Sequence, residues 1–149
     1  MQVSGSCQCG QIRYAVEGEP LMTYACHCSD CQKRTGSAFS LGAIYPVSAI
    51  SLEGELSIWK RVSDDGVTNT RYSCKACGNI IYGIGEATPD LLKLQPGTLD
   101  ETRNVQPDAH IWTRSAQAWF QLPADSLTYE TQPEQLTDVY SAVLERRAQ

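Results

Sequence analysis

The segment Cys26-His27-Cys28-Ser29-Asp30-Cys31 places three thiols within six residues. Side chains two positions apart in a strand share a face, so its first two cysteines are predicted to point the same way and the histidine between them the opposite way. Ser29 and Asp30 favour a turn, which is predicted to bring the last cysteine beside the other two. Three converging sulfurs supply three of the four ligands of a tetrahedral zinc ion, and a catalytic zinc keeps the fourth position open.

Four further cysteines flank this segment, and the odd total of seven, grouped at short spacings, indicates metal binding instead of disulfides. We refer to three groups: the first pair (Cys7 and Cys9), the triad (Cys26, Cys28 and Cys31) and the late pair (Cys74 and Cys77). In the arrangement that we favour, the first and late pairs close a four-cysteine zinc site and the triad remains as a three-sulfur site. In the alternative, the first two cysteines of the triad join the late pair, and the first pair is left over.

Length, composition and charge limit the class of protein. The 149 residues and 42% hydrophobic content fit one domain over residues 1–149, with a core at about residues 4–130. There is no apolar run suited to a membrane-spanning helix, and the first six residues lack signal-peptide features, so a cytoplasmic location with reduced thiols is expected. The net charge of −5 argues against nucleic acid as a partner, because proteins that bind nucleic acids normally carry a basic face.

Alternating apolar residues and turn signals predict a mainly β fold of short antiparallel strands. Strands are expected at residues 11–17, 21–26, 39–45, 56–61, 67–72, 79–84, 91–94, 109–112 and 118–122. A hairpin turn is expected at Asp64-Asp65-Gly66, and a basic loop at residues 32–37. This loop is either a solvated turn or a wall of the substrate site that supplies positive charge for an anionic ligand. A C-terminal amphipathic helix is expected at about residues 133–147, with Pro133 in its first turn and one apolar face. That face consists of Leu136, Val139, Tyr140, Val143 and Leu144.

The triad determines the predicted chemistry. His27 is excluded as a fourth ligand by its strand face, and His110 is a less favoured candidate. A zinc ion with three thiolates carries a formal charge of −1, so it activates water poorly but accepts another soft thiol ligand well. A bound substrate thiol would lose its proton and become a nucleophile. A zinc nucleobase deaminase is excluded because Ser73, not proline, precedes Cys74 and neither histidine begins the required His-X-Glu segment.

These residues resemble the glutathione-dependent formaldehyde-activating enzyme family, which includes centromere protein V. The resemblance covers about residues 5–129. Its main motifs are Gly5-Ser6-Cys7-Gln8-Cys9-Gly10, Cys26-His27-Cys28-Ser29-Asp30-Cys31-Gln32-Lys33 and Cys74-Lys75-Ala76-Cys77-Gly78. Weaker late matches are Gly97-Thr98-Leu99-Asp100, His110-Ile111-Trp112 and Trp119-Phe120.

The resemblance implies a β-tent fold with up to two zinc ions, a structural zinc on Cys7, Cys9, Cys74 and Cys77, and a catalytic zinc on Cys26, Cys28 and Cys31. It also implies S-(hydroxymethyl)glutathione synthase activity, formally a carbon–sulfur lyase reaction, with glutathione and formaldehyde or a related small aldehyde as substrates. Two other functions fit the same residues: a zinc-dependent thiol carrier without catalysis, and a zinc-stabilised scaffold. Substrate contacts are expected from Lys33, Arg34, Arg71 and His110.

Overall fold

The computed structural model describes residues 1–63 and 66–149, so Asp64 and Asp65 of the predicted hairpin turn lie outside the described residues. The chain divides into two compact units. The first unit comprises Met1–Pro20 and Ala43–Val105, and the second comprises Leu21–Gly42 and Gln106–Gln149. The expectation of a single domain stays a prediction, because two compact units can belong to one domain.

The first unit is built from antiparallel strands. A three-stranded sheet has the order β1-β2-β5, and the larger sheet runs β4-β9-β8-β7-β6. The strands are β1 (Gln2–Ser6), β2 (Arg13–Glu17), β5 (Ile50–Glu53), β6 (Leu56–Val62), β7 (Thr68–Cys74), β8 (Ile80–Gly85) and β9 (Leu91–Leu94), with β4 (Ser40–Pro46) entering from the second unit. Two short 3₁₀ turns, η1 (Val47–Ala49) and η2 (Pro96–Thr98), complete this unit.

The core of the first unit follows from alternation along its strands. Tyr14 and Val16 on β2 and Leu92 and Leu94 on β9 are buried, while the residues between them are more exposed. Burying such side chains contributes roughly 1.5–3 kcal/mol each. The hydroxyl of Tyr14 reaches the hydroxyl of Thr98 at 2.7 Å, so the one polar group of this tyrosine is also satisfied.

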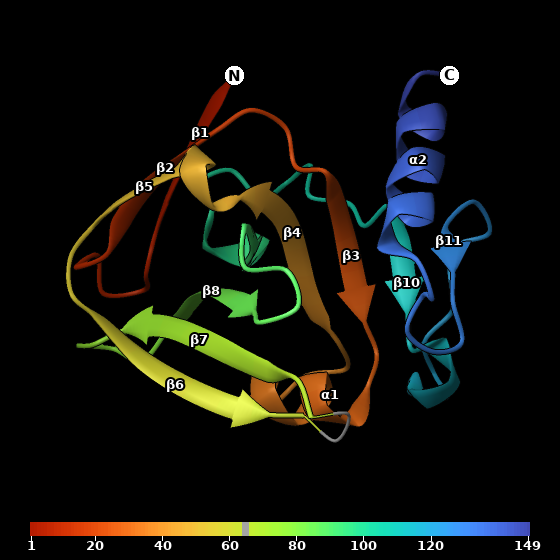
Figure 1. Cartoon of the computed structure of the whole chain (residues 1–149), viewed down its shortest axis with the longest axis horizontal. Helices are drawn as coiled ribbons and strands as arrows, with labels where there is room; N and C mark the ends of the chain where they lie inside the picture. The colour runs from red at the N-terminus through yellow and green to blue at the C-terminus, as the bar shows by residue number, and fades with distance from the viewer. Residues whose placement is uncertain (64–65) are drawn as a thin grey trace. The chain divides into compact units, whose positions relative to one another are not determined.

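The second unit contains parallel pairs and two helices. Its elements are β3 (Met22–Cys26), α1 (Ser29–Thr35), β10 (Ala109–Ile111), η3 (Thr113–Ser115), β11 (Leu127–Thr128) and α2 (Leu136–Arg147). Strand β10 pairs in parallel with both β3 and β11, and its register places Ile111 opposite Cys26. In Figure 1, α2 is the blue helix that precedes the C-terminus. Val139 and Val143 are the buried residues of this helix, and Arg147 donates to Asp108 Oδ2 at 2.6 Å.

The predicted mainly β fold with a C-terminal helix is confirmed, but several local predictions are wrong. Residues 118–122 form no strand, because Phe120 instead packs its ring against His27 and His110. The predicted turn at Ser29 and the basic loop after it are largely helix α1, whose polar sequence lacks the apolar periodicity that predicts helices. The parallel pairing of β10 also departs from the expected antiparallel strands, and Pro133 lies before α2 instead of in its first turn.

No helix in the described part of the chain combines the length and apolar character that crossing a membrane requires.

Candidate metal centres

The first and late pairs gather in the first unit as a four-cysteine cluster. One sulfur from each residue lies within 4.8 Å of all the others. The Sγ atoms of Cys7 and Cys9 are 3.5 Å apart, and those of Cys9 and Cys74 are 3.7 Å apart. Ligands about 2.3 Å from a tetrahedral zinc ion lie about 3.8 Å from one another. All seven cysteines are free, so the spacing of this cluster suits a shared metal ion.

Two similar turns present these sulfurs. The first pair lies in a turn directly after β1, not on a strand face as predicted. In the late pair, Cys74 ends β7 and Cys77 lies in the turn between β7 and β8. Each turn ends in a glycine with positive φ: Gly10 at 80° and Gly78 at 76°. Residues with a Cβ rarely adopt this conformation, so glycine lets both turns close tightly. The turns are tied together because the Gln8 N–H donates to Asn79 Oδ1 at 3.0 Å.

The thiols of the four-cysteine cluster differ in pKa. Burial disfavours the Cys7 thiolate, but an N–H donated by Ile12 and hydrogen bonds from neighbouring thiols lower its pKa to about 6. An N–H from Gln11 favours the Cys9 thiolate, but the neighbouring sulfurs raise its pKa to about 11. Adjacent thiolates repel one another, so full ionisation of the cluster requires a cation among them.

The triad lies in the second unit at the junction of β3 and α1. Cys26 ends β3, Cys28 is the N-cap residue of α1, and Cys31 lies in the first turn of that helix. The Cys31 N–H donates to Cys28 Sγ at 3.2 Å, so a thiol takes the place of the usual hydroxyl or carboxylate cap. The three sulfurs lie within 4.8 Å of one another, and the helix brings Cys31 to its neighbours where a turn was predicted.

The thiols of the triad also differ in pKa. Hydrogen bonds from the other two thiols, helped by the Ser40 hydroxyl and the positive charge of Arg34, lower the pKa of Cys31. Hydrogen bonds with Cys28 and Cys31, together with burial, raise the pKa of Cys26. The three sulfurs therefore favour a single shared negative charge, and a divalent cation would let all three ionise. This donor set fits a thiophilic ion such as zinc.

Among the described residues, neither histidine belongs to the group of possible metal ligands formed by the triad. His27 is fully buried, and its Nε2 lies 2.9 Å from Nδ1 of His110, which is also buried. Rings of Phe39 and Phe120 pack on His27 with centroid distances of 5.1 and 4.9 Å. Burial lowers the pKa of both imidazoles, so the structure favours a neutral histidine pair. The Nδ1 atom of His27 is buried and has no hydrogen-bond partner among the described residues.

The predicted substrate residues lie in different places. Lys33 and Arg34 are on α1 beside the triad, exposed and half-buried respectively, whereas Arg71 lies on β7 of the first unit. His110 is buried on β10 against His27. Contact of these four residues with a substrate stays a prediction.

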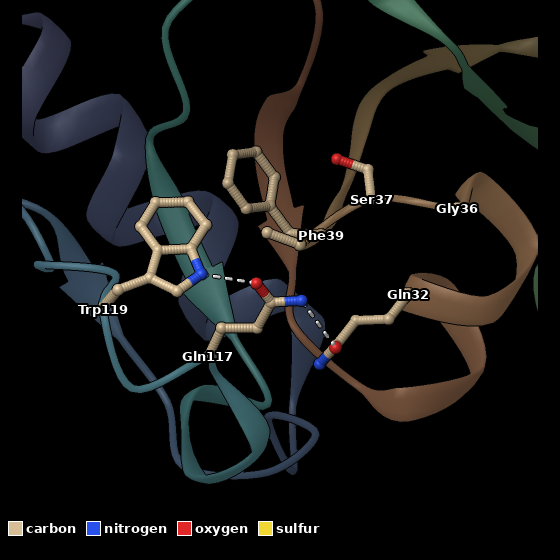
Figure 2. A pocket seen from close by; sticks show the side chains of 7 residues that line it. Gln32, Gly36, Ser37, Phe39, Gln117 and Trp119 are labelled. Carbon is tan, nitrogen blue, oxygen red and sulfur yellow. Dashed lines mark hydrogen bonds between the residues drawn. The ribbon is translucent and has the colours of Figure 1, made fainter.

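The second unit contains a hollow of about 620 Å³. Figure 2 shows its lining residues Gln32, Gly36, Ser37, Phe39, Gln117 and Trp119. None of these side chains carries a formal charge, and Trp119 is 69% exposed. Gln32, Gly36 and Ser37 belong to the segment 32–37 that the sequence offers as a wall of a substrate site, whereas no sequence signal points to Gln117.

Comparisons with known proteins agree with these features. Residues 2–115 match the family model described as glutathione-dependent formaldehyde-activating enzyme. Two fungal relatives, each provisionally named a glutathione-dependent formaldehyde-activating enzyme, are 34% identical to the chain. The Emericella nidulans protein matches over 77 residues, or 52% of this chain and 39% of its own length. The Sordaria macrospora protein matches over 74 residues, or 50% of this chain and 31% of its own length.

The matched segments therefore span well under half the length of these curated relatives. A crystal structure of a Rhodobacter sphaeroides protein shares the fold, with a TM-score of 0.53 and 21% identity. The structural match covers 70% of this chain and 91% of the crystallised chain.

Proposed function

Because this chain belongs to the glutathione-dependent formaldehyde-activating enzyme family, we propose that it joins a small thiol to a small aldehyde, with glutathione and formaldehyde as the first candidates. The reaction is the formation of S-(hydroxymethyl)glutathione, a carbon–sulfur lyase reaction in its formal direction. We further propose that the protein is cytoplasmic and acts as a zinc enzyme.

The observation that carries this proposal is the incomplete donor set of the triad. Its three sulfurs lie within 4.8 Å of one another, and no fourth His, Cys, Asp or Glu of the described residues joins them. Catalytic zinc sites characteristically have three protein ligands, whereas structural sites have four. A zinc ion on the triad would accept a substrate thiol as its fourth ligand and favour loss of the thiol proton.

The residues of this chain have distinct roles in the proposal. Cys26, Cys28 and Cys31 hold the metal, and the N-cap position of Cys28 fixes the direction of its sulfur relative to α1. Arg34 contributes positive charge beside Cys31. In the chemical step, the substrate sulfur forms a bond to the aldehyde carbon, the C=O π bond breaks, and the aldehyde oxygen takes up a proton. Atoms and charge balance without any further reactant.

The four-cysteine cluster has a different proposed role. Its four sulfurs complete a tetrahedral donor set and join residues far apart in the sequence, which is characteristic of a structural zinc site. We therefore propose up to two zinc ions per chain, with the ion in the four-cysteine cluster held more tightly.

Exchange NMR spectroscopy of formaldehyde with glutathione tests the proposed function, because the uncatalysed reaction already proceeds and only its rate has to be compared. The zinc-loaded protein is expected to accelerate exchange, and Cys28→Ser is expected to lose the acceleration while retaining the zinc of the four-cysteine cluster. Triad-dependent glutathione binding without faster exchange would instead identify a thiol carrier. Equal exchange and equal binding by both proteins would leave the triad a structural role only.

A further inference from the structure

Gln32 holds together two chain segments that meet near the triad. Its Nε2 donates one hydrogen bond to the carbonyl oxygen of His27 and another to that of Ser115, each at 2.9 Å. The carbonyl of His27 lies between two cysteines of the triad, and Gln32 itself follows the third. One side-chain amide thus connects the strand end that carries two sulfurs with the helix that carries the other.

The other face of the Gln32 amide is also engaged. Gln117 Nε2 approaches Gln32 Oε1 at 3.4 Å, and the Trp119 indole N–H donates to Gln117 Oε1 at 2.6 Å. Figure 2 shows Gln117 between Trp119 and Gln32, at the wall of the hollow. Both N–H groups of Gln32 have acceptors and its oxygen has a donor, so the orientation of this amide is fully specified.

Three polar groups of His27 form hydrogen bonds. Its N–H donates to the Ile111 carbonyl at 3.0 Å, its carbonyl accepts from Gln32, and its ring bonds to His110. The peptide units on both sides of this residue lead to cysteines of the triad. Since side chains alternate at this strand end, fixing His27 on one side also fixes where the neighbouring sulfurs point on the other.

We infer that Gln32 is a positioning residue for the triad: its amide holds the His27 carbonyl against α1 and so keeps the three sulfurs in a geometry that binds metal. This inference rests on the proposed function only in that the triad binds a metal ion. Residues that orient metal ligands affect affinity strongly, and their substitution typically costs about 10- to 100-fold.

The chemistry of the amide suggests two informative substitutions. Gln32→Met keeps a similar length but removes all three hydrogen bonds. Gln32→Glu keeps the shape but places a carboxylate, which cannot donate when ionised, against two carbonyl oxygens. Gln117→Met is the matched control, because it breaks the bonds to Gln32 Oε1 and Trp119 while leaving the two bonds from Gln32 to the carbonyls.

Cadmium-113 NMR of the full chain measures both clusters in one sample, since each bound cadmium gives its own resonance. Competition with a chelator then yields a separate affinity for each cluster. Gln32→Met is expected to weaken cadmium binding by the triad at least tenfold and to shift its resonance, while the resonance and affinity of the four-cysteine cluster stay unchanged. Gln32→Glu is expected to weaken the triad further, and Gln117→Met to change it less than threefold.

The outcomes separate this inference from the proposed function. If glutathione binds to the triad but Gln32→Met leaves its cadmium affinity and resonance unchanged, the positioning role is overturned and the proposed function survives. If Gln32→Met weakens cadmium at the triad but the loaded wild-type protein binds no glutathione, the positioning role is supported and the proposed function fails. Equal weakening of both clusters, or a wild-type triad that binds no cadmium, overturns the positioning role.

Discussion

The four-cysteine cluster and the triad gather their sulfurs by different means. The four-cysteine cluster joins two turns that are distant in sequence, with Cys9 and Cys74 separated by 65 positions. The triad comes from six consecutive residues at a strand-to-helix junction. The ties differ as well: Gln8 and Asn79 link the two turns, whereas Gln32 and His27 fasten the triad to neighbouring backbone.

This difference indicates that the four-cysteine cluster serves stability and the triad serves reactivity. A metal ion in the four-cysteine cluster cross-links the first unit, so binding energy there is folding energy. The triad adds no cross-link between distant segments of chain, and hydrogen bonds of Gln32 and Ile111 with neighbouring backbone support it in addition to the bond from Cys31 to Cys28. A site arranged in this way can exchange its fourth ligand without loosening the fold.

The largest expected effect is the loss of a ligand from the four-cysteine cluster. Cys77→Ser is expected to lower the melting temperature by about 20 °C or more, because structural zinc contributes on the order of 10 kcal/mol in small peptides and each kcal/mol corresponds to about 2–4 °C at this size. Cys28→Ser is expected to lower the melting temperature far less. Thermal unfolding followed by circular dichroism, with zinc content measured for each protein, compares them. Equal losses would contradict the division of roles.

Chelation should distinguish the two clusters without mutation. Wild-type protein reconstituted under reducing conditions is expected to hold up to two zinc ions. A moderate chelator should remove the ion of the triad first and leave the fold intact, because the four-cysteine cluster has one more thiolate ligand. Elemental analysis paired with circular dichroism at each chelator concentration measures this. Unfolding that accompanies loss of the first ion would show that the order is reversed.

Asn79→Ala tests the tie between the two turns of the four-cysteine cluster. The substitution removes the acceptor for the Gln8 N–H and is expected to cost about 1 kcal/mol of stability. Metal affinity should fall at the four-cysteine cluster and stay unchanged at the triad, which is the reverse of the expectation for Gln32→Met. Separate cadmium resonances report each affinity. A fall at the triad alone would invalidate the assignment of Asn79 to the other cluster.

Removal of two buried tyrosine hydroxyls should give the smallest effects, and only one of the two removals should cost stability. Tyr14→Phe removes the hydroxyl partner of Thr98 and is expected to cost about 1 kcal/mol at pH 8. Tyr140→Phe removes a buried hydroxyl without a hydrogen-bond partner among the described residues, so it should be neutral or stabilising. Chemical denaturation of both variants measures the difference. Equal destabilisation would show that the Tyr140 hydroxyl has a partner.

Tyr14 also sets an alkaline limit on stability. Burial raises its pKa to about 12, above the unfolded value near 10. The stability from the neutral phenol is therefore fully present below about pH 10 and is lost as pH rises from there through about 12. Wild type should become less stable over this interval, while Tyr14→Phe should show a smaller decline. Parallel slopes for the two proteins would contradict this account.

The sequence indicated all three cysteine groups, because the short spacings within each group are local. It also indicated most strands of the first unit, such as β9, whose bounds agree at Leu91–Leu94. It missed α1, because a seven-residue polar helix has too few turns to show a period. The contact of His27 with His110 joins residues 83 positions apart, and nothing in the local sequence encodes that approach. The grouping of the cysteines into two clusters was therefore accessible from sequence, whereas the surrounding hydrogen bonds were not.

The contiguity of the triad has a consequence for biosynthesis. As the chain leaves the ribosome, Cys26 and Cys31 emerge almost together, so their thiols can meet a metal ion long before Cys74 has been made. Closing the loop from Cys9 to Cys74 requires a larger entropy loss and must wait for most of the first unit. Metal capture by the nascent chain can thus begin at the triad, and the four-cysteine cluster closes late, when strands β7 and β8 are available to form the second turn.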